Sequence, residues 1–266
     1  MENYVDRKRL SESAYGDAKY LRARQSLYQY QQPYIDLPEI AVEELEKVEG
    51  VVVDVGCGNG AYLQRLRQVR PGVRRTTIGL DASLAMLRSV AAPVVVGDAM
   101  RLPLRDASAN ALLAMHMLYH LPDIPAAIRQ FHRVLRPGGI LIVSTNSRRD
   151  KAELGNLWQA AYGKVFGRAG DERLSFSRGF TLEDAPAVLG KDFTVVRSRS
   201  LTAAIRVTQP DPVLNYFRSY MPSLTPEESF QEDLLLATLR AMVVERIESR
   251  GEIRIGTRSG VLVCRK

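Results

Sequence analysis

Cysteine and histidine are scarce in this chain of 266 residues, with two and three copies respectively. The two cysteines, Cys57 and Cys264, stand far apart, so no disulfide framework is indicated. No spacing of cysteines and histidines suggests a structural zinc site. We therefore expect no metal centre, and a reducing cytoplasm as the compartment.

Long apolar runs are also missing. No stretch reaches the roughly 18 consecutive apolar residues of a membrane span. Residues 1–10 lack the apolar core of a secretory signal peptide. We expect a cytoplasmic protein with no membrane span. The chain is 45% hydrophobic, which suffices for one large α/β domain with insertions.

Lysine is rare as well, with seven copies against thirty arginines in a chain of net charge +7. A positive net charge can favour binding to polyanionic partners. The basic residues are scattered, however, and form no stripe interleaved with aromatic residues. The pattern therefore favours a solvated basic surface over nucleic-acid binding.

The most informative segment is residues 51–60. Three valines lead into Asp54, and glycines then occupy alternate positions at Gly56, Gly58 and Gly60. Glycine has no Cβ and accepts positive φ, so a turn rich in glycine can approach a ligand closely. Residues 61–67 continue with the apolar spacing of a helix. A strand, a glycine turn and a helix in this order are typical of the first unit of a nucleotide-binding α/β fold.

Two cofactors fit this turn. The spacing G-x-G-x-x-A that ends at Ala61 matches the dinucleotide fingerprint, and Asp81 follows about 20 residues later. This interpretation predicts an NAD(P)-dependent oxidoreductase. Alternatively, the acidic Asp54 and the extra Gly60 make the segment resemble motif I of the class I S-adenosylmethionine (SAM) methyltransferases. In that family the loop wraps the methionine part of the cofactor.

The downstream sequence favours the second interpretation. Two further predicted strands each end in a carboxylate, at Asp81 and Asp98. Residues 110–115 and 140–145 are predicted as the fourth and fifth strands. The Pro-Gly-Gly motif within residues 132–141 is similar to the crossover connection before the fifth strand of these methyltransferases. A generic doubly wound domain would explain the strands but neither the second acid nor this turn.

The resemblance covers about residues 50–145 and implies SAM as the cofactor. Asp81 would accept the ribose hydroxyls, and Asp98 would meet the adenine amino group. The segment Tyr20-Leu-x-x-Arg24 resembles an N-terminal element of relatives that covers SAM, with the arginine available to its carboxylate. The alternative for Arg24 is an exposed helix residue. The predicted cofactor-binding set is Asp54, Gly56, Cys57, Gly58, Gly60, Asp81, Ala82, Asp98, Ala99, Met100, His116 and Arg24.

The predicted fold is a doubly wound α/β sheet of seven mostly parallel strands, with helical lid elements. An antiparallel last strand is predicted over residues 260–266. Residues 1–49 are expected to form a helical extension that covers the cofactor site. The methyltransferase domain would span residues 50–266, with helical inserts at 146–192 and 208–250 that form the acceptor lid.

The candidate catalytic residues are His120 and His116, which follow the predicted fourth strand. A neutral imidazole can take a proton at physiological pH. Their four-residue spacing would place both on one face of a helical turn. The alternative is that a histidine caps a backbone carbonyl and shapes the wall of the site.

The acceptor is predicted to be a small organic molecule, aromatic or apolar in character. Five aromatic residues could wall its pocket or simply pack in the core: Tyr15, Tyr28, Trp158, Tyr162 and Phe166. The segment after the fourth strand resembles the ubiquinone- and menaquinone-type small-molecule methyltransferases. An RNA methyltransferase, an oxidoreductase and a SAM-binding regulatory protein remain the alternatives. We expect a monomer or a homodimer.

Overall fold

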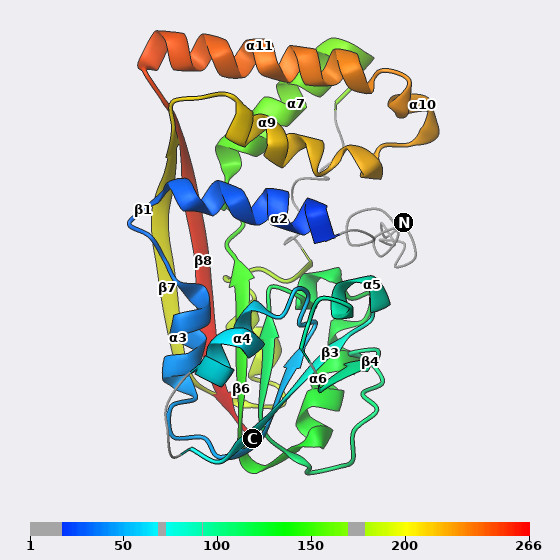
Figure 1. Cartoon of the computed structure of the whole chain (residues 1–266), viewed down its shortest axis with the longest axis vertical. Coiled ribbons are helices and arrows are strands. Elements are labelled where there is room, and N and C mark those ends of the chain that lie inside the picture. Colours follow the sequence, from blue (N-terminus) through cyan, green and yellow to red (C-terminus); the bar gives the residue numbers. More distant parts are fainter. Residues whose placement is uncertain (1–17, 69–72, 92, 170–178) are drawn as a thin grey trace.

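The computed structural model describes residues 18–68, 73–91, 93–169 and 179–266. One mixed sheet of eight strands runs through these residues in the order β1-β7-β8-β6-β5-β2-β3-β4 (Figure 1). In chain order the strands are β1 (Gln31–Gln32), β2 (Gly50–Val55), β3 (Arg75–Asp81), β4 (Val94–Val96), β5 (Ala109–Met115), β6 (Leu135–Asn146), β7 (Thr194–Val207) and β8 (Ile253–Arg265).

The valine-rich β2 lies between β3 and β5 and is parallel to both. Its apolar side chains are covered on both faces of the sheet, as expected for a central parallel strand. Because β2, β3 and β5 run in the same direction, their carboxyl ends meet at one edge. The glycine turn follows β2 at that edge, which is where open α/β sheets bind ligands.

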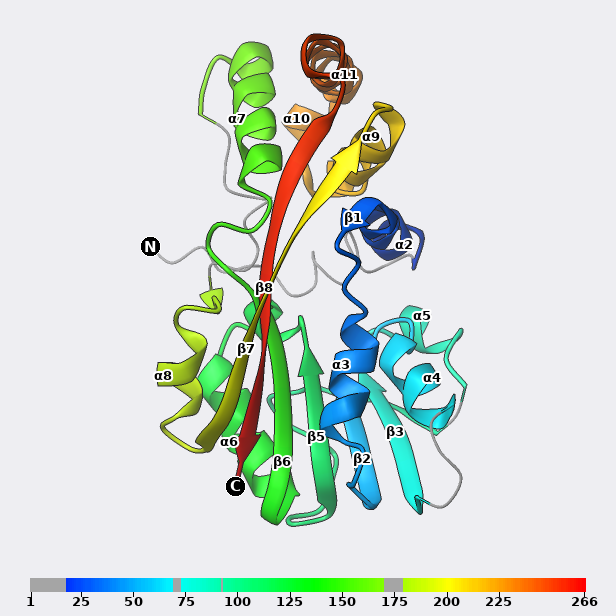
Figure 2. The ribbon, with the colours of Figure 1, turned by 90° about the vertical axis from the view of Figure 1, so that its left-hand side faces the viewer.

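Helices cover both faces of this part of the sheet, with α3 and α4 on one face and α6 and α8 on the other (Figure 2). Asp36 and Asp123 each accept a backbone N–H at the start of α3 and α6, and a proline follows both. The bounds are α3 (Leu37–Glu44), α4 (Ala61–Gln68), α6 (Ile124–Val134) and α8 (Ala185–Leu189).

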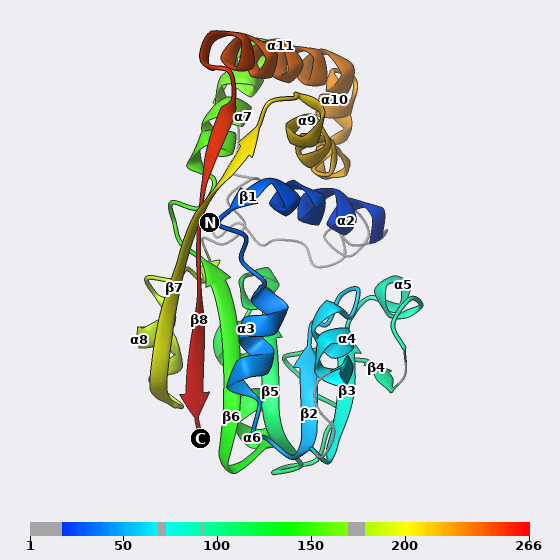
Figure 3. The same ribbon diagram turned by 60° about the vertical axis from the view of Figure 1, so that its left-hand side comes forward.

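The antiparallel strands β7 and β8 extend far beyond the parallel strands and carry a helical cap (Figures 1 and 3). The cap has its own apolar core, which includes Trp158, Tyr162 and Phe217. It consists of α7 (Ala152–Phe166), α9 (Asp211–Arg218), the short 3-10 helix η4 (Met221–Ser223), α10 (Pro226–Ser229) and α11 (Glu232–Arg250).

The N-terminal segment lies between the cap and the sheet (Figure 3). Its helix α2 (Ala18–Ser26) and the 3-10 turn η1 (Leu27–Tyr30) precede β1, which pairs with β7. Two short elements stand close to the glycine turn, α5 (Leu84–Leu87) after β3 and the 3-10 helix η2 (Leu118–His120) after β5. No helix in the described ranges has the length and apolar character to cross a bilayer.

The predicted architecture is confirmed, including the antiparallel last strand, which inserts between β6 and β7. The two-residue β1 adds an eighth strand to the predicted seven, because the N-terminal segment turns back along the edge of β7. Strand β7 is continuous over Thr194–Val207, with a register shift between Val195 and Arg197. The last strand begins earlier than predicted, at Ile253, because it runs up into the cap.

Candidate active site

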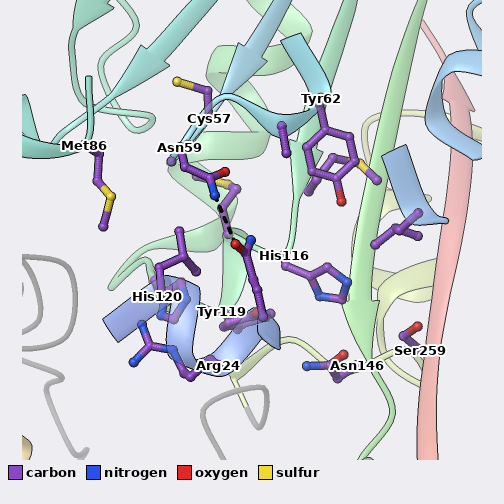
Figure 4. Close-up of a pocket in the computed structure, with 18 of the residues that line it drawn as sticks. Arg24, Cys57, Asn59, Tyr62, Met86, His116, Tyr119, His120, Asn146 and Ser259 are labelled. Atoms are coloured by element: carbon purple, nitrogen blue, oxygen red, sulfur yellow. Dashed lines mark hydrogen bonds between the residues drawn. The ribbon is translucent and has the colours of Figure 1, made fainter. Parts of the chain in front are cut away.

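A cavity of about 570 Å³ opens at the carboxyl ends of β2, β3 and β5, between the sheet, α2 and the cap. Its size falls in the range of small-molecule sites. Figure 4 shows His116, His120 and Tyr62 around the same space, with Arg24 entering from α2. The cavity therefore brings together elements from the sheet, the N-terminal segment and the cap.

The glycine turn folds back onto β3. The backbone N–H groups of Gly56 and Cys57 both donate to the carbonyl of Leu80, at 2.7 and 3.0 Å. Gly58 has φ +53°, and a Cβ at this position would have a methyl carbon of Leu21 on α2 as its nearest neighbour, at 3.5 Å. Gly56, Cys57 and Gly58 line the cavity, so the turn offers bare backbone to a ligand.

Asp81 ends β3 and lines the cavity together with Ala82. Its two carboxylate oxygens accept the backbone N–H groups of Gly58 and Ser83, at 2.9 and 2.8 Å. Burial raises the pKa of this carboxyl, while the backbone N–H groups oppose the rise. The hydrogen bonds fix the carboxylate beside the turn, and a carboxylate has about four acceptor sites, more than these bonds use.

Asp98 follows β4 and lines the cavity with Ala99. One of its oxygens accepts the backbone N–H of Met100 at 2.9 Å. Met100 itself is outside the cavity lining and packs against the core beneath the sheet. Of this predicted group, the structure therefore brings Asp98 and Ala99 to the cavity but not the Met100 side chain.

Asp54 is only 1% exposed and lies behind the turn rather than in the cavity lining. Burial, and then the Asp81 charge, raise its pKa to about 7. Its Oδ2 has no hydrogen-bond partner among the described residues. Gly60 also stays outside the lining, so these two predicted cofactor residues stand behind the lining and support the turn.

His116 directly follows β5 with φ 52°, an unusual backbone conformation for a residue other than glycine. Its N–H donates to both the carbonyl and the hydroxyl of Ser144, at 3.1 and 3.0 Å. Burial, and then the Lys151 charge, lower the pKa of His116 to about 4. The imidazole is therefore neutral at physiological pH.

His120 ends η2, and its ring lies 4.4 Å from the Tyr119 ring, measured between centroids. Burial, followed by the charges of Arg24 and His116, lowers its pKa to about 3. Both histidines line the cavity as predicted, but not from one face of a helix. The turn at His116 separates them before η2 begins.

Arg24 reaches the cavity from α2. Its guanidinium lies over the Tyr220 ring, 5.3 Å from the centroid, and donates to the carbonyl of Ser219 at 3.3 Å. The side chain therefore joins α2 to the end of α9. A second contact joins α2 to the glycine turn, where Asn59 donates to Gln25 at 3.0 Å, dashed in Figure 4.

Of the two roles left open for the five aromatic residues, pocket wall or core packing, the structure shows core packing for three. Trp158 and Tyr162 are buried in the core of the cap and do not line the cavity. Phe166 packs against the same core, and Tyr15 lies outside the described residues. Tyr28 does line the cavity. The other lining aromatics, which sequence reasoning did not single out as a wall, are Tyr34, Tyr62, Tyr119, Tyr216 and Tyr220.

Several polar residues that line the cavity belong to no recognisable sequence motif. Asn146 and Ser259 are register partners on β6 and β8, and Lys151 follows in the loop before α7. These residues lie at one cavity because β8 pairs with β6 in a register that joins positions more than a hundred residues apart in the sequence. No group of three metal-binding side chains occurs in the part of the chain that the structure describes.

Comparison with known proteins agrees with this geometry. Residues 53–143 match the family model described as a methyltransferase domain. The chain therefore contains a methyltransferase domain. This domain includes the glycine turn, both acids at the strand ends and both histidines.

Two of the curated relatives are named as methyltransferases. A malonyl-[acyl-carrier protein] O-methyltransferase from Yersinia pestis is 35% identical over 119 residues, which are 43% of this chain and 43% of the relative. A demethylmenaquinone methyltransferase from Roseiflexus castenholzii is 36% identical over 97 residues, 34% of this chain and 40% of the relative. The chain thus matches less than half the length of either protein.

A solved structure shares the fold over more of the chain. It is described as a candidate methyltransferase of an antibiotic biosynthesis pathway from Anabaena variabilis. The match has a TM-score of 0.58 and 16% identity, and covers 85% of this chain and 95% of that one. The shared fold therefore extends beyond residues 53–143.

Proposed function

We propose that this protein is a SAM-dependent methyltransferase that acts on a small organic acceptor. The observation that carries the proposal is the meeting of the glycine turn, Asp81 and Asp98 at one cavity inside a methyltransferase domain. An NAD(P) site would share the turn and Asp81. The family match favours SAM over NAD(P).

The residues present fit SAM. Gly58 leaves open backbone where a side chain would stand, and the buried Asp54 has an orphaned oxygen behind the turn. Asp81 would hold the ribose hydroxyls and Asp98 the adenine, while Arg24 would bind the cofactor carboxylate. Bound SAM would supply an electrophilic methyl group on a sulfonium.

The chain's own task is then to align the acceptor and exclude water. We propose that α2 and η1 of the N-terminal extension, residues 1–49, cover the cofactor. The inserts at 146–192 and 208–250 would form the acceptor lid of a domain spanning 50–266. Helices α7, α9, α10 and α11 of these inserts build the cap (Figure 3), and Tyr216 and Tyr220 line the cavity from it.

The acceptor class follows from the cavity walls. Tyrosines supply apolar ring surface with polar tips, which suits an aromatic or apolar molecule with a few oxygen groups. The names of the two relatives specify a malonyl-[acyl-carrier protein] and a demethylmenaquinone as acceptors, and we propose a biosynthetic intermediate as the acceptor here. The RNA methyltransferase alternative gains no support from the comparisons. A cytoplasmic location and a monomeric or homodimeric state stay predictions.

Binding measurements test the cofactor. We expect calorimetry to detect SAM and S-adenosylhomocysteine binding and no comparable binding of NAD. Asp81→Asn should weaken SAM by about 1.5–3 kcal/mol, because a hydrogen bond to a charged acceptor is worth that much. Asp192→Asn, an exposed site away from the cavity, serves as the control. Tight NAD binding, or equal SAM affinity in both variants, would contradict the assignment.

A further inference from the structure

One end of the cavity carries polar groups that the proposed cofactor contacts leave unused. Asn146 and Ser259 line it as register partners on β6 and β8 (Figure 4). Lys151 and Tyr28 line the same cavity from the loop before α7 and from η1. These four residues, the polar anchor set, come from four separate elements.

Lys151 and its neighbour form a buried ion pair. The Lys151 side chain is 11% exposed and the Asp150 side chain 5%. The Lys151 Nζ also donates to the Tyr28 hydroxyl oxygen at 2.9 Å. An ammonium has three N–H donors, and the third has no partner among the residues that the structure describes.

Tyr28 completes the arrangement. Its oxygen accepts from Lys151, so its own O–H proton is left as a donor. Within the described ranges that proton has no recorded acceptor. The cavity end therefore offers at least two donors, an ammonium N–H and a phenol O–H, to an oxygen of a ligand.

The backbone at Lys151 is held in a costly conformation. Its φ of 52° and ψ of 37° lie in the left-handed region, which residues other than glycine rarely adopt. Two hydrogen bonds tie the loop to β8: Lys151 N–H to the Gly256 carbonyl at 2.9 Å, and Arg258 N–H to Asp150 Oδ1 at 2.8 Å. Such strain persists where the surroundings fix it, and it is concentrated at ligand sites.

Lys151 supplies a charged donor at this end, and Asp150, which also lines the cavity, balances its charge. Burial alone would lower the pKa of Lys151, but Asp150 and the Tyr28 hydroxyl raise it above its ordinary value, so the ammonium stays charged. Arg148 also lines the cavity, although it is paired with Asp184. The Lys151 charge also lowers the pKa of His116 and opposes the rise in the pKa of Tyr220, two other residues that line the cavity.

We propose that Lys151 and Tyr28 bind a carboxylate of the methyl acceptor, with Asn146 and Ser259 completing the contact. This proposal rests on the proposed methyltransferase function and narrows its substrate class to carboxylic acids with an aromatic or apolar body. Lys151 and Tyr28 act as specificity-determining residues that position the acceptor.

Matched pairs of small molecules test the proposal. Calorimetry with saturating S-adenosylhomocysteine would compare benzoate with benzamide, and 2-naphthoate with 2-naphthamide. Each pair has nearly the same shape and differs in charge. We expect each acid to bind the wild type about tenfold or more tightly than its amide, as charged hydrogen bonds allow.

Two variants should remove this preference. Tyr28→Phe deletes only the hydroxyl, and Lys151→Met combined with Asp150→Asn removes both charges without stranding one of them. Lys164→Met, at an exposed site on α7, should keep the preference. Binding of S-adenosylhomocysteine by every variant would show that each one folds.

The outcomes separate the two proposals. If S-adenosylhomocysteine binds but the acids bind no better than the amides, the carboxylate anchor is overturned and the cofactor assignment stands. The same result follows if the preference survives in both variants. Titrations without the cofactor product complete the test: an acid preference that depends on Lys151 would support the anchor even if S-adenosylhomocysteine failed to bind.

Discussion

At the scale of single residues, His116 and His120 share surroundings that keep both imidazoles neutral. Their folded-state pKa values, about 4 and about 3, lie below the ordinary 6.5. The unfolded chain therefore binds more protons than the folded chain between about pH 6.5 and 4. By linkage, these residues make the free energy of unfolding decrease as the pH falls through that window.

A neutral imidazole can accept a proton, but a low pKa makes it a weak base. If the acceptor must lose a proton of low acidity, His120→Ala should lower the single-turnover rate by about 10²–10⁴-fold with SAM affinity little changed. The wild-type rate should stay level as the pH falls, until protonation of the histidines near pH 4 removes the accepting lone pair.

His116→Ala provides the comparison, since it removes the other histidine that lines the cavity. Single-turnover methyl transfer by all three proteins across a pH range is the measurement. Wild-type rates in both variants would make the histidines wall residues and move the search for a base to Tyr28 and Tyr119.

At the scale of elements, two glycines of the same turn have different roles: Gly58 serves ligand binding and Gly60 serves folding. A Cβ at Gly58 would meet nothing closer than 3.5 Å and would stand at the cavity lining. A Cβ at Gly60 would lie 2.8 Å from a Val90 methyl carbon, away from the cavity. Both positions have positive φ, so alanine costs about 1–2 kcal/mol at either one.

We expect Gly58→Ala to weaken SAM binding by the folded protein at least tenfold, in addition to the loss of stability. The reason is that the alanine methyl group takes space beside the ligand. Gly60→Ala should lower the melting temperature further, through the contact with Val90, and leave the affinity of the folded protein nearly intact. Thermal unfolding and calorimetry on the two variants check this pair of outcomes. Equal loss of affinity in both would show that the turn binds SAM through its overall shape.

The same element scale shows what the sequence could and could not predict. The strand, turn and acid pattern around Asp54, Asp81 and Asp98 is local, so residue spacing was enough to predict it. The Lys151–Tyr28 contact depends on how β8 and the N-terminal segment fold back onto the sheet. Trp158 and Tyr162 have the spacing of one helix face, but only the packing of α7 against α9 and α11 decides that this face is buried.

At the scale of the whole molecule, two apolar regions share one pair of strands. The cores on the two faces of the parallel sheet contain residues of α3, α6 and α8, whereas the cap core contains residues of α7, α9 and α11. Among the described strands, β7 and β8 alone run through both regions, and the cavity lies between these regions. Stability of the cap and binding of the cofactor should therefore respond to different substitutions.

Trp158 tests this separation. It is 1% exposed in the cap core, where its ring stacks on Phe217 at 6.2 Å between centroids. Trp158→Ala should lower the free energy of unfolding by about 3–5 kcal/mol, the usual cost of truncating a buried aromatic residue. Because the side chain does not reach the cavity, SAM affinity of the folded variant should stay close to that of the wild type. Urea unfolding followed by circular dichroism gives the first quantity and calorimetry the second. Unchanged stability with weakened ligand binding would instead make Trp158 a wall of the site and join the cap to the cavity as one unit.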